Sequence, residues 1–197
     1  MPHQHFILHK PYGYLSQFSS QSSREARKKM LGELFDFPAG TMAVGRLDED
    51  SEGLLLLTTD GRMSERIRGQ QTEKEYYAQV DGLLDDQGLA RLRAGLAIGV
   101  HGQPYRTSPC AARHIPTPLL APRARKIRDA RHGPTSWISL TLTEGRFRQV
   151  RKMTAAVGCP TLRLVRVRVG GIWLGGLAPG AVREIADAEL AALLAEG

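Results

Sequence analysis

The sequence predicts an α+β fold built on a mainly antiparallel mixed sheet with flanking helices. Predicted strands outnumber predicted helices, and the two do not alternate in the regular rhythm of a doubly wound fold. A chain of 197 residues is long enough to bury a substantial core. Neither a repeat of about 20 to 50 residues nor a break in composition indicates a second domain. We therefore expect one domain over residues 1–197, with a basic, proline-rich loop at about 113–134.

Strands are predicted where apolar residues alternate, or form short runs bounded by turn residues. They are residues 6–8, 42–44, 54–58, 76–80, 137–142 and 161–169. In the last of these the apolar phase slips between Leu164 and Val165, which predicts a bulge or a bend.

Helices are predicted where apolar residues recur at helical spacing. They are residues 24–35, 62–68, 86–97 and a final helix that Asp187 can cap. Between residues 104 and 134 repeated prolines allow only strand fragments and a long loop.

Lys and Arg number 27 against 20 Asp and Glu, a formal net charge of +7. This charge favours a polyanionic partner, with nucleic acid first among them, although a basic surface kept for solubility has the same composition. Cys110 and Cys159 lack the spacing of a zinc site or a disulfide framework and suit a reducing cytoplasm. The longest apolar run, Leu54 to Leu57, is too short to cross a membrane, and we expect no signal peptide.

The segment from Gly45 to Gly53 places several carboxylates in a loop between apolar strands. Such a cluster is unfavourable unless it binds a cation, pairs with arginine or performs catalysis. A calcium loop that began at Asp48 would need a glutamate where Thr59 stands, and helices rather than strands on either side. No phosphate-binding loop follows. A solvated acidic turn with Arg46 as its local partner stays open beside a catalytic role.

A second informative segment is basic and runs from Gly145 to Met153. As a helix it would carry Arg148, Arg151 and Lys152 on one face and apolar residues on the opposite face. No acidic residue occurs between residues 146 and 157, although solvated helix faces usually mix charges. Arginines at positions 163, 166 and 168 extend the positive character. The pattern indicates a phosphate-binding surface.

Together the two segments resemble the motifs of the pseudouridine synthases that act on ribosomal RNA of the small and large subunits. Residues 45–61 resemble G-R-L-D-x-D/N-S/T-x-G-L with its continuation to T-x-D/N-G, and residues 144–153 resemble E-G-R-x-x-Q-V-K/R-K/R-M. Lys74 and Tyr76 match a K-x-Y motif between them. Many members of this family also carry an S4 RNA-binding domain. Because the similarity begins near residue 5, we expect none here, and RNA contact by the catalytic domain itself or by a partner.

The resemblance implies the pseudouridine synthase catalytic fold and isomerisation of a uridine in structured ribosomal RNA, most closely large-subunit (23S) RNA. The reaction breaks the bond from N1 to C1′ and rejoins the base through C5, so it requires no cofactor and no metal. Asp48 would be the catalytic carboxylate, acting as nucleophile or as base. Tyr76 would stack on the flipped base, Arg151 would pair with Asp48, and Leu164 would form an apolar wall.

The remaining residues expected at the substrate share positive charge or a place in these motifs. They are Arg46, Leu47, Arg146, Arg148, Gln149, Lys152, Arg125, Lys126 and Arg128. We expect a cytoplasmic monomer that contacts RNA and no membrane. A non-catalytic RNA-binding or ribosome-assembly protein would show the same basic surface, but it gains nothing from carboxylates that face RNA. A metal-dependent phosphate-ester hydrolase is a further alternative that chelators would reveal.

Overall fold

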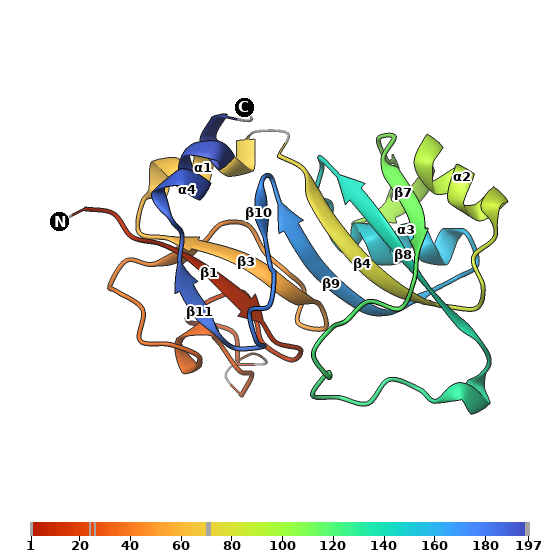
Figure 1. Cartoon of the computed structure of the whole chain (residues 1–197), viewed down its shortest axis with the longest axis horizontal. Helices are drawn as coiled ribbons and strands as arrows, with labels where there is room; N and C mark the ends of the chain where they lie inside the picture. Colours follow the sequence, from red (N-terminus) through yellow and green to blue (C-terminus); the bar gives the residue numbers. More distant parts are fainter. Residues whose placement is uncertain (1, 24, 26, 70–71, 196–197) are drawn as a thin grey trace. The chain divides into compact units, whose positions relative to one another are not determined.

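The computed structural model describes residues 2–23, 25, 27–69 and 72–195 (Figure 1). The chain divides into two compact units, which are described separately. Unit 1 comprises Met1–Thr72 and Arg166–Gly197, and unit 2 comprises Glu73–Val165. None of the helices within the described ranges combines the length and the apolar character needed to cross a membrane.

Unit 1 is built around a long buried strand. Its elements are β1 (His5–Lys10), the 3-10 helix η1 (Leu31–Glu33), β2 (Met42–Ala43), β3 (Glu52–Thr58), α1 (Gly61–Gly69), the end of β9 (Thr161–Val169), β10 (Ile172–Trp173), β11 (Val182–Glu184) and α4 (Asp187–Ala195). The strand order is β11-β1-β3-β9, and β1 is antiparallel to both of its neighbours. All seven residues of β3 are buried, and burial on both faces explains its continuous apolar run.

Unit 2 packs two helices on a second group of strands. Its elements are β4 (Lys74–Asp81), α2 (Asp86–Ala94), β5 (Ala97–Val100), β6 (Gln103–Arg106), β7 (Ala111–Ile115), the 3-10 helix η2 (Ala130–His132), β8 (Thr135–Leu142), α3 (Gln149–Ala156) and the start of β9. The order is β9-β4-β8-β7, with β8 antiparallel to β4 and β7. Leu92 of α2 and Met153 of α3 are fully buried in one cluster with Ile138 of β8. The strands β5 and β6 form a separate hairpin.

The α+β class and the mainly antiparallel pairing are confirmed. Each predicted strand is present, within a few residues of its expected bounds, and so are the helices near residues 62–68 and 187–195. The proline-rich region forms β6, β7 and a loop, as expected. The prediction of a single catalytic domain over residues 1–197 stays a prediction.

The predicted helix over residues 24–35 is wrong for the residues described there. Met30 has an extended backbone, with φ −124° and ψ 165°. The Leu15 N–H donates to the Lys29 carbonyl at 2.9 Å, and the Leu31 N–H donates to the Gln17 carbonyl at 3.0 Å. These bonds to residues 15–17 replace helical bonds, so tertiary pairing overrides the local apolar spacing.

The helix expected over residues 86–97 ends at Ala94. Gly95 follows with φ +75°, and a Cβ on it would lie 2.3 Å from the Thr107 carbonyl oxygen. Only glycine fits so close an approach at positive φ. The chain turns there and enters β5, a strand that the sequence pattern did not predict.

Residues 161–169 form one strand, β9, and the bulge or bend expected there stays a prediction. Residues 163–167 are all buried, so alternation between a buried and an exposed face is lost. The slip in apolar phase lies next to the point at which β9 passes from unit 2 into unit 1, between Val165 and Arg166.

Candidate active site

The loop that carries Asp48 connects β2 to β3 and is fixed at the residue before it. The Ser16 hydroxyl donates to the Leu47 carbonyl at 2.8 Å and accepts the Leu47 N–H at 3.0 Å. Both residues are buried. One side chain therefore satisfies both backbone groups of Leu47, and this fixes the direction in which the chain enters Asp48.

The loop is also fixed on the other side of Asp48. The Gly13 N–H donates to the Glu49 carbonyl at 2.8 Å, and the Ser51 N–H donates back to the Asp48 carbonyl at 3.0 Å. The next residue but one, Gly53, has φ +104°, and a Cβ on it would lie 2.3 Å from the Arg166 carbonyl oxygen. The backbone around Asp48 is thus defined by its contacts with residues 13–16 and with β9.

A buried cation lies beside this acidic loop. Lys10, at the end of β1, has no exposed surface, and its ammonium donates to the carbonyls of Pro11 at 3.0 Å and Tyr14 at 2.7 Å. Burial lowers the pKa of Lys10 to about 8, although the carboxylates of Glu52, Asp50, Asp48 and Glu49 act in the opposite direction. Lys10 compensates part of the negative charge that gathers around Asp48.

Sequence reasoning missed Lys10 and Ser16. A signal for Lys10 was present, because a lysine ends the apolar run of β1 directly before Pro11-Tyr12-Gly13. A charged residue that continues a buried strand needs a partner, and the acidic loop offers carboxylates. Ser16 gave no comparable signal, since its hydroxyl acts on a residue far away in the chain.

Two other charged residues of the acidic loop, Glu49 and Arg46, have partners at the surface. Glu49 pairs with Lys28 at 2.5 Å, and Arg46 donates to the Gln17 amide oxygen at 2.8 Å. Arg46 is exposed and, with Gln17 and Arg68, lines a pocket of about 380 Å³. The alternative of a solvated acidic turn expected Arg46 to pair with the carboxylates of the loop. In the structure Arg46 instead contacts the side-chain amide of Gln17.

In unit 2 the basic segment differs from its prediction in one respect. Arg148 is not part of the helix, because α3 begins at Gln149 and Arg148 caps it in a left-handed conformation, φ +54°. Arg148 therefore does not share a helix face with Arg151 and Lys152. The apolar face is as expected, with Val150 and Met153 buried.

The turn before α3 is held by Glu144 and Gln149. The buried Gln149 accepts the Arg146 N–H at 2.9 Å and donates to the Glu144 carboxylate. Glu144 also accepts the Tyr105 hydroxyl and the Ser108 N–H at 3.0 Å. Burial opposes ionisation of Glu144, but these hydrogen bonds outweigh it and lower its pKa. The described contacts of Gln149 are thus internal, while Arg146 is exposed over the Tyr105 ring, 4.6 Å from its centroid.

The three remaining residues expected at the reaction centre of unit 2 are partly or fully buried. Leu164 belongs to the core cluster, and Tyr76 packs against that cluster from β4. Arg151 is half-buried and donates to the Thr161 carbonyl at 3.5 Å. Asp48 belongs to unit 1 and Arg151 to unit 2, so the pairing of the two stays a prediction.

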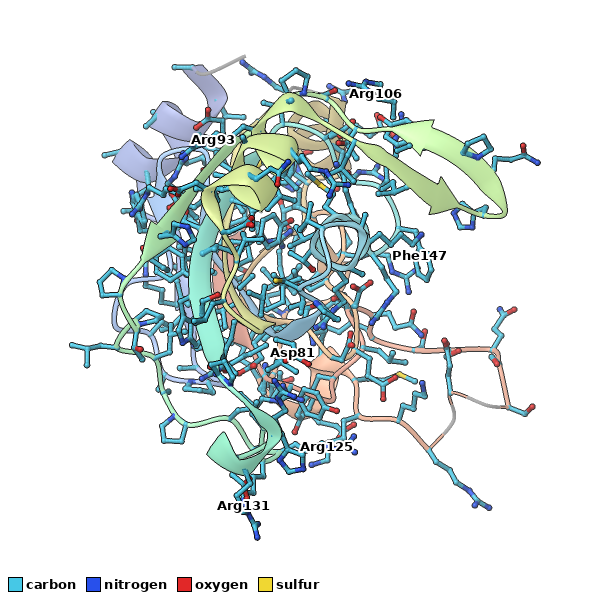
Figure 2. The ribbon with its side chains drawn as sticks, turned by 90° about the vertical axis from the view of Figure 1, so that its right-hand side faces the viewer. Asp81, Arg93, Arg106, Arg125, Arg131 and Phe147 are labelled. Carbon is cyan, nitrogen blue, oxygen red and sulfur yellow. The ribbon has the colours of Figure 1, made fainter. Side chains whose placement is uncertain are left out.

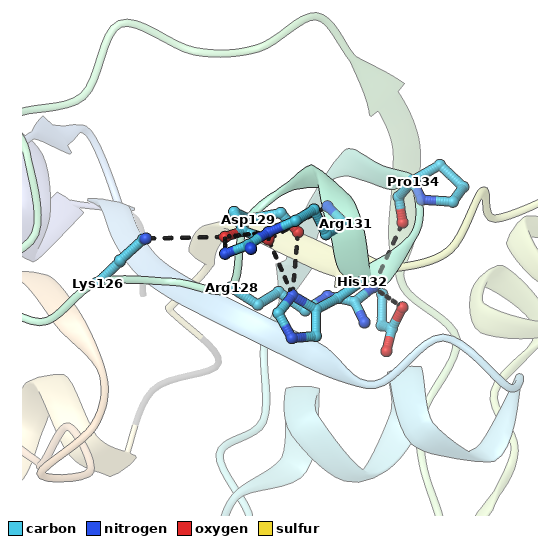
Figure 3. Close-up of polar contacts among 7 residues, drawn as sticks. Lys126, Arg128, Asp129, Arg131, His132 and Pro134 are labelled. Carbon is cyan, nitrogen blue, oxygen red and sulfur yellow. Dashed lines mark hydrogen bonds and ion pairs between the residues drawn. The ribbon is translucent and has the colours of Figure 1, made fainter.

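The basic loop after β7 contains anchored and exposed cations (Figure 3). Arg128 pairs with Asp81 at the end of β4, and its side chain is only 21% exposed. Lys126 lies 3.8 Å from the Asp129 carboxylate and is 81% exposed. Arg125 is exposed as well and is marked with Arg131 in Figure 2. Arg128 therefore fixes the loop to the sheet, while Arg125 and Lys126 present charge to solvent.

Two arginines of β9 do not extend the basic surface as expected. Arg163 is buried and donates to the Ala121 carbonyl at 2.8 Å, which attaches the basic loop to β9. Arg166 is buried too and donates to the Leu54 carbonyl at 2.7 Å. Both guanidinium groups satisfy backbone carbonyls, so this part of the predicted phosphate surface is wrong.

Metal ligands do not gather anywhere in the described part of the chain, since no group of three His, Cys, Asp or Glu side chains there could hold an ion. Cys110 and Cys159 are free thiols. The histidines near the N-terminus contact other groups: His5 bonds to the Thr58 hydroxyl at 2.8 Å, and His9 to the Leu177 carbonyl at 2.7 Å.

The comparison with known proteins agrees with the α+β fold, with the fixed loop that carries Asp48 and with the basic turn before α3. The family described as RNA pseudouridylate synthase matches residues 4–156. The chain belongs to this family. It is an isomerase that converts uridine in RNA to pseudouridine, and the non-catalytic alternative is not supported.

Three known proteins show to which members of the family the chain is similar. The chain is 47% identical over 176 residues to ribosomal large subunit pseudouridine synthase E of Xanthomonas axonopodis pv. citri, covering 88% of this chain and 89% of the relative. It is 40% identical over 181 residues to the protein of the same name from Vibrio parahaemolyticus, covering 91% and 72%. A crystal structure of a pseudouridylate synthase has a TM-score of 0.77 and 27% identity, covering 98% and 74%. The resemblance expected from the motifs, including its catalytic fold, is confirmed.

Proposed function

We propose that this protein isomerises one specific uridine of large-subunit (23S) ribosomal RNA, with Asp48 as its catalytic carboxylate. The relatives named above support the substrate, since their names refer to the ribosomal large subunit. The observation that carries the role of Asp48 is the fixed backbone on both sides of it, through Leu47 and Glu49. A catalytic group gains rate when its position is set before the substrate arrives.

In this proposal the RNA supplies an unstacked uridine, because a stacked base hides the glycosidic bond. Asp48 acts as nucleophile or as base while the bond from N1 to C1′ breaks. Arg151 pairs with Asp48 and would orient its carboxylate toward the sugar. Tyr76 stacks on the base and Leu164 provides the apolar wall.

The remaining proposed contacts are to the RNA backbone and the bases around the target. Arg46 and Leu47 adjoin Asp48 on its loop, and exposure supports Arg46 as a direct contact. Arg146, Arg148, Gln149 and Lys152 would act from the turn and helix α3, with Gln149 acting through the position of Arg146. In the basic loop Arg125 and Lys126 would contact phosphate, and Arg128 would set the position of the loop.

The role of Asp48 is tested by Asp48→Asn. Because C5 loses its hydrogen when it bonds to C1′, RNA labelled with tritium at C5 of uridine releases tritium to water. We expect Asp48→Asn to release none, yet to fold and bind the RNA as the wild type does. Glu49→Gln is the matched control, since the Glu49 side chain pairs outward with Lys28, and it should keep most of the activity. Substantial tritium release by Asp48→Asn would remove Asp48 from the catalytic role.

The substrate is tested by mapping pseudouridine in ribosomal RNA from cells with and without the protein. We expect one site in the large-subunit RNA to lose its modification and to regain it when the wild type, but not Asp48→Asn, is restored. A change confined to small-subunit RNA would contradict the proposal.

We further propose that a single copy acts in the cytoplasm without a cofactor or metal. Purified protein should modify prefolded RNA in the presence of EDTA, because the proposed chemistry needs only a carboxylate. Folding the RNA beforehand separates any need of the RNA for magnesium from a need of the enzyme.

The basic loop is tested by the double substitution Arg125→Gln and Lys126→Gln. We expect weaker RNA binding and a salt dependence that is flatter by about one unit of slope for each lost phosphate contact. An unchanged slope would mean that the loop does not touch the RNA backbone.

A further inference from the structure

An exposed pair of stacked rings lies at the tip of the β5–β6 hairpin of unit 2. His101 occupies the hairpin turn with φ +50°, and its ring lies on that of Phe147, with centroids 5.5 Å apart and planes inclined by 23°. Phe147 is 55% exposed, and Figure 2 shows it directed away from the ribbon. A large apolar ring at such exposure adds little to the core.

One cation contacts this pair, and two others lie on the neighbouring turn and hairpin of the same unit. The Lys152 ammonium lies 4.9 Å from the centroid of the Phe147 ring. Arg146 lies over Tyr105 on the second strand of the hairpin, and Arg106 is exposed at the end of that strand. Glu144, the acidic residue beside them, is held by Tyr105, Ser108 and Gln149. The exposed rings are therefore accompanied by positive charge.

Aromatic rings beside lysine and arginine match the chemistry of a single-stranded nucleotide. Every base has a π-face that stacks on an aromatic side chain, and its phosphates are attracted to the cations. The Phe147 ring follows Arg146 directly and precedes the cap of α3, so its backbone lies in a turn that Glu144 and Gln149 hold in place. A fixed ring loses little freedom when a base stacks on it.

We propose that the His101–Phe147 pair, with Lys152, is a stacking site for one unpaired nucleobase of the RNA substrate other than the target uridine. The site deepens the proposed function by assigning a second point of recognition. It rests on RNA as the substrate but not on the catalytic role of Asp48. It would select RNA that offers an unpaired nucleotide in addition to the target, rather than a continuous duplex.

The experiment measures RNA binding in the Asp48→Asn background, so that turnover does not enter, and KM and kcat in the active background. Loss of one stacked base costs about 1–3 kcal/mol, so Phe147→Leu should weaken binding and raise KM by about 5- to 150-fold, with a much smaller effect on kcat. His101→Ala should act in the same direction, and Phe147→Tyr should restore binding because it keeps the ring. Leu83→Ala is the matched control, since Leu83 is an apolar residue of the same unit that is 69% exposed and lies outside the basic loop, and it should bind as the wild type does.

The stacked base itself is found with substrates that lack one base at a time. In the wild type we expect one abasic position besides the target to weaken binding, and in Phe147→Leu that position should have no further effect. Equal binding by wild type and Phe147→Leu, or equal sensitivity of both to every abasic position, would overturn the proposal. So would a Phe147→Leu variant that loses kcat but binds normally. If Asp48→Asn kept its activity, the proposed catalytic role would fail, and the binding comparison would still be decisive for the stacking site.

Discussion

Lys10 offers the strongest test of how the acidic loop is supported. Its ammonium is fully buried and donates to the carbonyls of Pro11 and Tyr14. The substitution Lys10→Met keeps the length of the side chain but removes the donor and the charge. Each unpaired buried carbonyl costs about 1–3 kcal/mol, while removal of a buried ammonium recovers part of that cost. The two effects oppose each other at pH 7, so stability at a single pH is a weak test.

The pH dependence separates the two effects. Burial places the pKa of Lys10 at about 8 in the folded protein, against 10.5 in its ordinary state. The unfolded chain therefore holds this proton up to about pH 10.5, whereas the folded protein releases it near pH 8. Between these values the unfolded state binds more protons, so stability rises with pH. The rise attributable to Lys10 is at most about 1.4 kcal/mol per pH unit and about 3 kcal/mol in total.

The measurement is the free energy of unfolding in urea at several pH values from 7.5 to 10.5. We expect the wild type to gain about 3 kcal/mol relative to Lys10→Met over this range, since the variant lacks the titrating group. Lys126→Met is the control, because Lys126 is 81% exposed, and its curve should run parallel to that of the wild type. Parallel curves for wild type and Lys10→Met would refute the argument that a buried ammonium is held beside the loop at a lowered pKa.

Three further predictions concern the acidic loop, the basic loop and the start of β3. Ser16→Ala removes the hydroxyl that binds both backbone groups of Leu47, so we expect a loss of about 1–3 kcal/mol in urea unfolding and a lower kcat at little-changed KM. Arg128→Met breaks the pair with Asp81, so residues 116–134 should be cut faster in limited proteolysis; an unchanged cleavage rate would remove Arg128 as the anchor. Gly53→Ala places a Cβ 2.3 Å from a backbone oxygen at φ +104°, and thermal unfolding should show a destabilisation of at least about 2 kcal/mol.

Local pattern predicted most of the fold because most of its elements are buried in a regular way. The apolar run from Leu54 to Leu57 and the alternation from Trp137 to Leu142 both lie in strands. A continuous apolar run is typical of a strand buried on both faces, and alternation is typical of a strand buried mainly on one face. Residues 24–35 show the limit. Apolar spacing there suits a helix, yet bonds from residues 15 and 31 to residues 29 and 17 hold the backbone extended at Met30. No local sequence pattern contains that information.

The sequence located the acidic loop but not what fixes it. Asp48 was identifiable because several carboxylates between apolar strands call for an explanation, and because the motif around it is long. Ser16 lies 31 residues from the Leu47 groups that it binds. A single serine forms no repeating sequence pattern, so nothing in the sequence indicates this contact. Arg163 and Arg166 show the opposite error: their positive charge indicated a surface, but both are buried against backbone carbonyls. Charge in a sequence does not reveal whether its partner is a phosphate or the protein's own backbone.

The motif over residues 144–153 combines both kinds of role within one turn. Glu144 and Gln149 bind each other, and Glu144 also accepts the Tyr105 hydroxyl of strand β6, so their polar groups are used inside the protein. Arg146 and Phe147, which lie between them, are exposed. An internal hydrogen-bonded pair of this kind sets the direction of the residues that it encloses, because both ends of the short segment are held. The charged and amide residues of the motif therefore support a turn from which the apolar ring of Phe147 is 55% exposed to solvent.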